Sequence, residues 1–160
     1  IKGFNLAQME RDLKARLKGQ PISKEKVPLE TDFASITGSV TATNGLVQNK
    51  DLQAAMPHAR AIGAGKAYLV SEELDYLLKV KFTSKAIGQG GRSYAEMDKV
   101  PLPIRIRGTF SQPRFEPDYE AVIEAMAKQR IEEEKQKLEE KAKKKIEKEI
   151  GEELQKLFKR

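Results

Sequence analysis

The C-terminal quarter of the chain most constrains the fold, because it predicts one long helix. Residues 118–160 contain no proline and one glycine, and Glu, Lys, Ala, Gln and Leu, all good helix formers, dominate them. Lys and Arg number 12 and Asp and Glu 10 over residues 121–160, with frequent Glu-to-Lys pairs four residues apart. Forty helical residues extend about 60 Å, which is too long for one small sheet to cover. The sequence therefore predicts a body, residues 1–120, and a charged amphipathic helical tail, residues 121–160.

The apolar residues of this tail recur mainly at steps of four: Ile131, Leu138, Ala142, Ile146, Ile150, Leu154 and Leu157. Steps of four exceed the 3.6-residue period, so the apolar stripe drifts around a straight helix and fits a heptad zipper poorly. Such a stripe suits a curved surface or a membrane surface. The alternative is a solvated helix held by its own charge pairs.

The body begins with a short helix. Apolar residues at three- and four-residue steps predict it over residues 4–18, with Asn5 as the N-cap. The β-rich segments that follow are 33–43, 46–55, 58–70, 74–83, 102–110 and 114–119. Asn44-Gly45, between the first two, is a strong hairpin signal.

No helical segment between these β-rich segments is long enough for a parallel crossover, so five to seven antiparallel strands are expected. The predicted fold class is therefore α+β. It is a curved antiparallel β-sheet, forming a groove or half-barrel, with a short N-terminal helix and a long amphipathic C-terminal helix.

Two strands alternate between apolar and polar residues, which indicates a sheet with one apolar face. Leu77 is the exception to this alternation, and Arg105 and Arg107 share the polar face, either solvated or contacting phosphates or acidic partners. If the helices leave this apolar face open, the face would bind lipid. If the start of the tail covers the face, its residues form an ordinary hydrophobic core. The candidate groove residues are Leu74, Tyr76, Leu78, Val80, Phe82, Ile104, Ile106 and Phe110.

Several chemistries are excluded by composition. Without cysteine the chain has no disulfide, thiolate nucleophile or Cys-based zinc site, and with one histidine, His58, it has no two-His metal site. The Gly-Gln-Gly-Gly segment at 88–91 lacks the Lys-Ser/Thr ending of a phosphate-binding loop and predicts a turn. We expect no enzyme activity and no cofactor. Acids and bases are interspersed, so nucleic-acid binding is not expected despite the net charge of +6.

The order and spacing of these segments over residues 4–120 resemble the C-terminal region of AsmA-family proteins. The shared details are Thr-Asn-Gly-Leu at 43–46, Gly63 and Gly65 before a strand, Leu-Asp-Tyr at 74–76, and the pattern P-x-x-I-x-x-x-G-T-F-x-x-P-x-F at 101–115.

The resemblance implies a bacterial envelope protein of the periplasm, anchored to the inner membrane and linked to outer-membrane assembly and phospholipid transport. It implies a β-groove that holds acyl chains, with phospholipid as the ligand. Because the chain starts at Ile1, we expect it to be cut from a longer protein that carries the anchor. The alternative is a structural or interaction module whose residues 121–160 recruit a membrane surface or another envelope protein.

Overall fold

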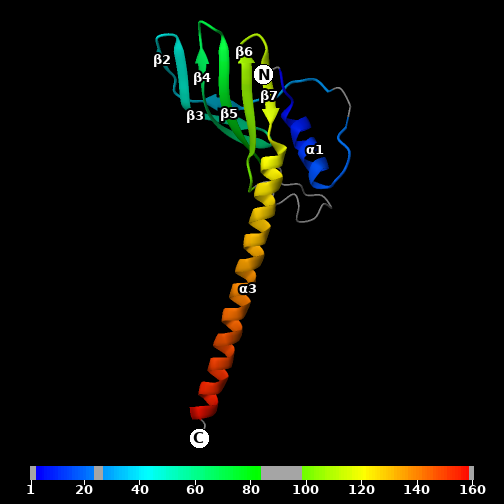
Figure 1. Cartoon of the computed structure of the whole chain (residues 1–160), viewed down its shortest axis with the longest axis vertical. Coiled ribbons are helices and arrows are strands. Elements are labelled where there is room, and N and C mark those ends of the chain that lie inside the picture. Colours follow the sequence, from blue (N-terminus) through cyan, green and yellow to red (C-terminus); the bar gives the residue numbers. More distant parts are fainter. Residues whose placement is uncertain (1–2, 24–26, 84–98, 159–160) are drawn as a thin grey trace. The chain divides into compact units, whose positions relative to one another are not determined.

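A computed structural model describes residues 3–23, 27–83 and 99–158 (Figure 1). The Gly-rich turn at 88–91 and the side chain of Leu157 lie outside the described residues. The chain forms two compact units, Ile1–Ile123 and Glu124–Arg160. The fold is α+β as predicted, with helix α1 (Leu6–Leu17), a seven-stranded sheet and helix α3 (Tyr119–Phe158).

The strands form one open antiparallel sheet, and from β3 to β7 strands that follow each other in the chain are neighbours in the sheet. Figure 1 shows that the strands bend along their length, so the sheet is curved. The strands are β1 (Ser35–Thr37), β2 (Thr41–Thr43), β3 (Leu46–Met56), β4 (Ala59–Tyr68), β5 (Glu73–Phe82), β6 (Leu102–Thr109) and β7 (Pro113–Pro117).

Two local sequence signals are confirmed in the structure. The Asn5 side chain caps α1 by accepting a hydrogen bond from the main-chain N–H of Gln8 at 2.9 Å. Asn44 and Gly45 both have positive φ, 50° and 79°. Positive φ at both central residues is the requirement of the type I′ hairpin turn, whose twist matches the flanking strands β2 and β3.

The first β-rich segment does not form one strand. It divides into β1 and β2, which pair with opposite ends of β3, and β3 is irregular between Asn49 and Leu52. Polar side chains fill the gap: the Asp51 carboxylate accepts hydrogen bonds from the Ser39 N–H at 2.8 Å and the Ser39 hydroxyl at 2.7 Å. The Asn49 side chain donates to the Ser39 carbonyl at 2.7 Å. These side-chain hydrogen bonds replace the main-chain hydrogen bonds that are missing where β1 and β2 are separated, so the polar groups of Ser39 have partners.

The register gives the sheet one apolar face, which we call the inner face. Its β5 side chains, Leu74, Tyr76, Leu78, Val80 and Phe82, lie opposite small β4 residues throughout. Those β4 residues are Ala67, Gly65, Gly63, Ala61 and Ala59. Because these β4 residues are alanine or glycine, they leave space over β4 that large side chains from the neighbouring strands can occupy.

The hydrophobic core of the body lies at one end of the inner face. Phe82, Val80, Leu102 and Ile104 are almost completely buried, and Leu13 of α1 and Val122 of α3 are further buried side chains. Thr31 is the buried polar residue of the described chain. Its hydroxyl accepts from the Leu6 N–H at 3.1 Å and donates to the Phe4 carbonyl at 3.0 Å, which fixes the segment leading into α1.

Candidate functional site

An apolar cavity of about 220 Å³ lies on the inner face, next to the buried core. Apart from the Tyr76 hydroxyl, its lining side chains are hydrocarbon or thioether. They come from the segment before α1, from the first residue of α1, and from six of the strands and their flanks: Phe4, Leu6, Phe33, Ile36, Leu52, Ala54, Met56, Ala61, Tyr76, Leu78, Val80, Ile106 and Phe115.

Three aromatic rings enclose one side of this cavity. Phe4 stacks on Phe115 with 4.5 Å between ring centroids, and Phe33 meets Phe4 edge-on at 6.5 Å. The three residues lie far apart in the sequence, before α1, before β1 and in β7. Their contact ties the N-terminal segment to the sheet and shields this part of the inner face from water.

Tyr76 forms the boundary of the cavity toward the open end of the inner face. A Cβ atom at Gly65 would lie 2.2 Å from its Cδ2 atom, and one at Gly63 would lie 2.8 Å from its Cε1 atom. The two glycines therefore let the ring cross β4, and its hydroxyl donates a hydrogen bond to the Asn49 Oδ1 atom on β3. Burial, and secondarily the Asp51 charge, raises the pKa of Tyr76, so the hydroxyl remains a neutral donor.

The structure places the eight candidate residues in four different surroundings. Tyr76, Leu78, Val80 and Ile106 line the cavity, with Val80 also almost completely buried. Phe82 and Ile104 belong to the buried core and do not line the cavity, while Leu74 is half-buried on the same face beyond Tyr76.

Phe110 lies beyond the end of β6 and does not line the cavity. The strand ends at Thr109, so the alternation does not extend as far as residue 110. The Phe110 side chain is 46% exposed, and its main-chain N–H donates to the Glu72 carbonyl of the neighbouring turn at 3.1 Å.

Alternation within single strands did not indicate the other cavity residues. Ala54 and Ala61 lie in one row with Val80 because of the pairing of β3 with β4 and of β4 with β5, which the alternation of a single strand does not provide. Phe4 and Phe33 lie outside strands, and no local pattern connects them to the sheet.

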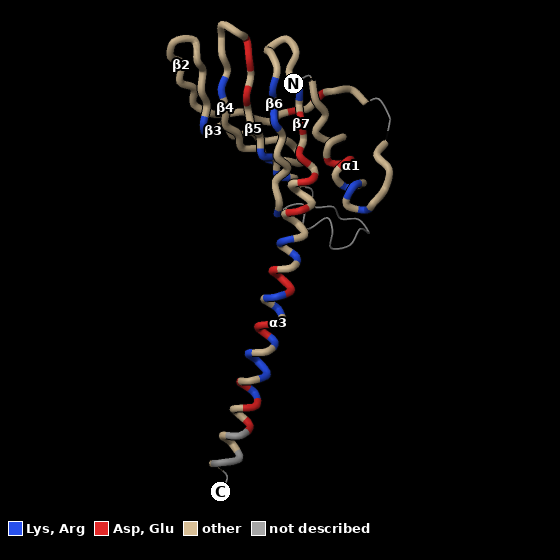
Figure 2. The backbone as a smooth tube through the Cα atoms, viewed as in Figure 1, with Lys and Arg blue, Asp and Glu red and all other residues tan. Residues whose placement is uncertain are grey.

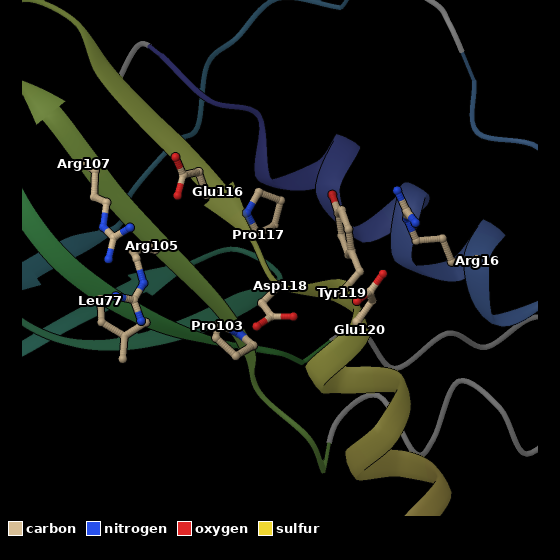
Figure 3. A pocket seen from close by; sticks show the side chains of 10 residues that line it. All are labelled: Arg16, Leu77, Pro103, Arg105, Arg107, Glu116, Pro117, Asp118, Tyr119 and Glu120. Atoms are coloured by element: carbon tan, nitrogen blue, oxygen red, sulfur yellow. The ribbon is translucent and has the colours of Figure 1, made fainter.

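A second hollow, of about 460 Å³, lies on the opposite side of the sheet, which we call the outer face (Figure 3). Its residues are Arg16, Leu77, Pro103, Arg105, Arg107, Glu116, Pro117, Asp118, Tyr119 and Glu120. Arg107 pairs with Asp75 of β5 at 3.8 Å, whereas Arg105 has no ion pair within the described part of the chain. This hollow mixes cations with carboxylates.

Tyr119 connects this hollow to α1. The Arg16 guanidinium lies 4.8 Å from the centre of its ring (Figure 3). Burial raises the pKa of Tyr119 to about 12, and the Asp12 carboxylate adds to the rise while Arg16 opposes it. The phenol is therefore neutral at physiological pH and acts here as a packing group.

The second unit exposes the apolar stripe of the tail. Ile131, Leu138, Ile146, Ile150 and Leu154 are all exposed on α3. Within the described ranges, no helix has an apolar stretch long enough to cross a membrane. No group of three or more His, Asp or Glu side chains there is arranged to hold a metal ion.

No family model, curated protein or solved structure matches this chain, so the candidate site is interpreted from its own geometry.

Proposed function

We propose that the body of this protein binds an acyl chain of a lipid in the apolar cavity on the inner face. The observation that carries the proposal is a cavity of about 220 Å³ whose lining is almost entirely hydrocarbon. An apolar cavity of about 150 Å³ is large enough for benzene, whereas pockets that enclose a drug-sized ligand have about 300–1,000 Å³. The size therefore suits one stretch of an acyl chain, with the rest of the lipid outside.

The lining also favours hydrocarbon over polar ligands. No buried side-chain nitrogen or oxygen in the described residues lacks a hydrogen-bond partner, so the cavity offers no unsatisfied polar group for a directional contact. Transfer of each methylene from water contributes about 0.8 kcal/mol, which is roughly a fourfold gain in affinity. Affinity in a series of fatty acids should rise by this factor per methylene until the cavity is filled.

The wider role that we propose is a non-enzymatic segment of a periplasmic protein, anchored to the inner membrane, in outer-membrane assembly and phospholipid transport. Its support is the resemblance of residues 4–120 to the AsmA C-terminal region, together with the open, curved antiparallel sheet.

The test compares Leu78→Asp with Leu74→Asp. Both residues are half-buried on the inner face of β5, but only Leu78 lines the cavity. An unpaired polar group in an apolar site costs about 1–3 kcal/mol, so Leu78→Asp should weaken binding by about tenfold or more. Leu74→Asp should leave binding nearly unchanged. Solvent extraction with mass spectrometry measures copurified lipid, and displacement of a fluorescent fatty acid measures affinity.

Circular dichroism of each variant checks that the fold is intact. A second variant, Ala54→Leu, fills the cavity from β3, where Ala54 is buried at its edge, and should reduce binding without introducing a charge. Absence of lipid and of fatty-acid binding in the unsubstituted protein would contradict the proposal. Equal losses in Leu78→Asp and Leu74→Asp would contradict the assignment to this cavity.

The exposed apolar stripe of α3 favours a second candidate function. In this alternative, the protein is a structural or interaction module, and the tail recruits a membrane surface or another envelope protein. Five exposed aliphatic residues on one helix, separated by charged residues, are suited to such recruitment.

A further inference from the structure

Cations dominate the outer face over the central strands. Figure 2 marks the Lys and Arg positions along β4, β5 and β6. The pairing register places six cations and two acids there, together with two aliphatic side chains, one alanine, one proline, one tyrosine and one threonine. The set is Arg60, Ile62, Ala64, Lys66, Tyr68, Glu73, Asp75, Leu77, Lys79, Lys81, Pro103, Arg105, Arg107 and Thr109.

Two of these cations face each other directly. Arg60 of β4 pairs in register with Lys81 of β5, and Lys79 is two residues further along β5 on the same face. Like charges directly opposite each other destabilise a sheet. The Arg60 guanidinium is also held in place, because it donates to the Met56 carbonyl at 2.6 Å and to the Ala59 carbonyl at 2.8 Å.

No carboxylate within the described part of the chain forms an ion pair with Lys79, Lys81 or Arg105. Arg105 lies in register opposite Glu116, and Arg107 pairs with Asp75, so the positive charge that lacks an acid opposite it is concentrated at Arg60 and Lys81, with Lys79 beside them. Negative charge from outside the chain would relieve this repulsion.

The cations surround an apolar centre. Ile62 is 59% exposed, and Leu77, the residue that breaks the alternation of β5, is half-buried on the same face. Ile62, Leu77 and Lys79 line a shallow hollow of about 370 Å³, and Leu77 also lines the hollow of Figure 3 beside Arg105. Leu77 therefore lines two hollows, and each is lined by both cations and carboxylates.

We propose that the outer face of β4–β6 binds the anionic headgroups of a lipid surface. Lys79, Lys81 and Arg105 would contact phosphates, while Ile62 and Leu77 would enter the apolar layer just below the headgroups. Exposed aliphatic side chains ringed by cations match that layered chemistry. The aromatic residue of this face, Tyr68, lies opposite Glu73 at the end of β4 away from Arg60 and Lys81. The cations are therefore not accompanied by a ring for stacking on bases, and a single-stranded nucleic acid fits less well. The surface lies opposite the cavity and does not depend on acyl-chain binding there.

Vesicle cosedimentation of the full chain tests this surface. The probes are phosphatidylcholine vesicles with and without about 30% phosphatidylglycerol, and binding is expected to the anionic vesicles alone and to weaken with salt. Each Lys or Arg near an anionic surface contributes roughly a fivefold factor in partitioning, so Lys79→Gln with Lys81→Gln should reduce it by about 25-fold.

A matched control has the same charge change and the same spacing on α3: Lys143→Gln with Lys145→Gln, both exposed. It should retain nearly all binding. The Lys79/Lys81 variant should be at least as thermally stable as the unsubstituted protein, since it removes the repulsion between Lys81 and Arg60. Loss of binding without loss of stability distinguishes a binding role from a structural one.

A third variant, Ile62→Ser, keeps every charge and should still weaken binding by removing the exposed aliphatic group. The proposal is overturned if the unsubstituted protein does not bind anionic vesicles, or binds both vesicle types equally. It is also overturned if the α3 control loses as much binding as the Lys79/Lys81 variant. Tighter binding to duplex DNA or to polyglutamate than to anionic vesicles would overturn the lipid assignment.

Discussion

The close approach of Tyr76 to β4 predicts a large effect from a single methyl group. In Gly65→Ala, the new Cβ would lie 2.2 Å from the Tyr76 Cδ2 atom, 2.6 Å from the Tyr76 Cα atom and 2.6 Å from the Asp75 carbonyl oxygen. Two of these three atoms belong to the main chain of β5, so no side-chain rotation removes the conflict. The strands must separate locally, which strains their pairing and displaces the Tyr76 hydroxyl from Asn49.

Gly63 provides the matched comparison on the same strand and face. A Cβ there would lie 2.7 Å from the Leu78 Cδ2 atom, 2.8 Å from the Tyr76 Cε1 atom and 3.2 Å from the Leu52 Cδ2 atom. All three are side-chain atoms, and the leucine ends can move. Overpacking typically costs 1–3 kcal/mol, so we expect about 3 kcal/mol for Gly65→Ala and about 1 kcal/mol for Gly63→Ala.

Thermal unfolding followed by circular dichroism measures the difference. In a protein of this length each kcal/mol corresponds to roughly 2–4 °C, so Gly65→Ala should lower Tm by about 6–12 °C. Adding Tyr76→Leu to Gly65→Ala should restore part of the loss, because the ring contact disappears while the main-chain contacts remain. Equal Tm values for the two alanine variants, or complete rescue by Tyr76→Leu, would refute this reasoning.

Two further predictions concern the ends of α3. The pKa of Tyr119 is raised to about 12 from 10.0, so its contribution to stability is full below pH 10 and is lost as pH rises toward 12. Tyr119→Phe should therefore show a smaller fall in urea midpoint between about pH 9 and pH 11.5, and an unchanged fall would contradict the assignment. A chain that stops at Lys128 lacks all five exposed stripe residues and should keep the circular dichroism and cooperative melting of the sheet. If the tail recruits a partner protein or a membrane surface, this shortened chain should fold but no longer bind that partner or membrane. Loss of folding would contradict the recruitment function.

Local patterns were sufficient to predict most of the fold. Asn44-Gly45 identified a hairpin because few residues accept positive φ at both positions, and the alternation in β5 identified the inner face. The segment 33–43 was predicted as continuous because its composition is β-favouring throughout. Its break at Ser39 depends on Asn49 and Asp51, whose side chains reach it only after β3 has formed.

The candidate site was predictable only in part, for the same reason. The alternation located Tyr76, Leu78 and Ile106, but it could not separate cavity-lining residues from core residues such as Phe82, which have the same period. That distinction depends on where α1 and the aromatic rings lie, and Phe4 meets Phe115 across more than a hundred residues of sequence. Leu77 is an exception to the apolar–polar alternation of β5 because it is an apolar residue on the cationic outer face.

The interrupted edge formed by β1 and β2 has a consequence for association with other chains. An exposed edge strand is normally a template on which a foreign strand can add and aggregation can begin. Here the edge consists of two strands of three residues each, and the N–H and carbonyl of Ser39 between them are already bonded inward to Asp51 and Asn49. An incoming strand would find no continuous row of free main-chain groups, so the polar interruption protects this side of the sheet against growth.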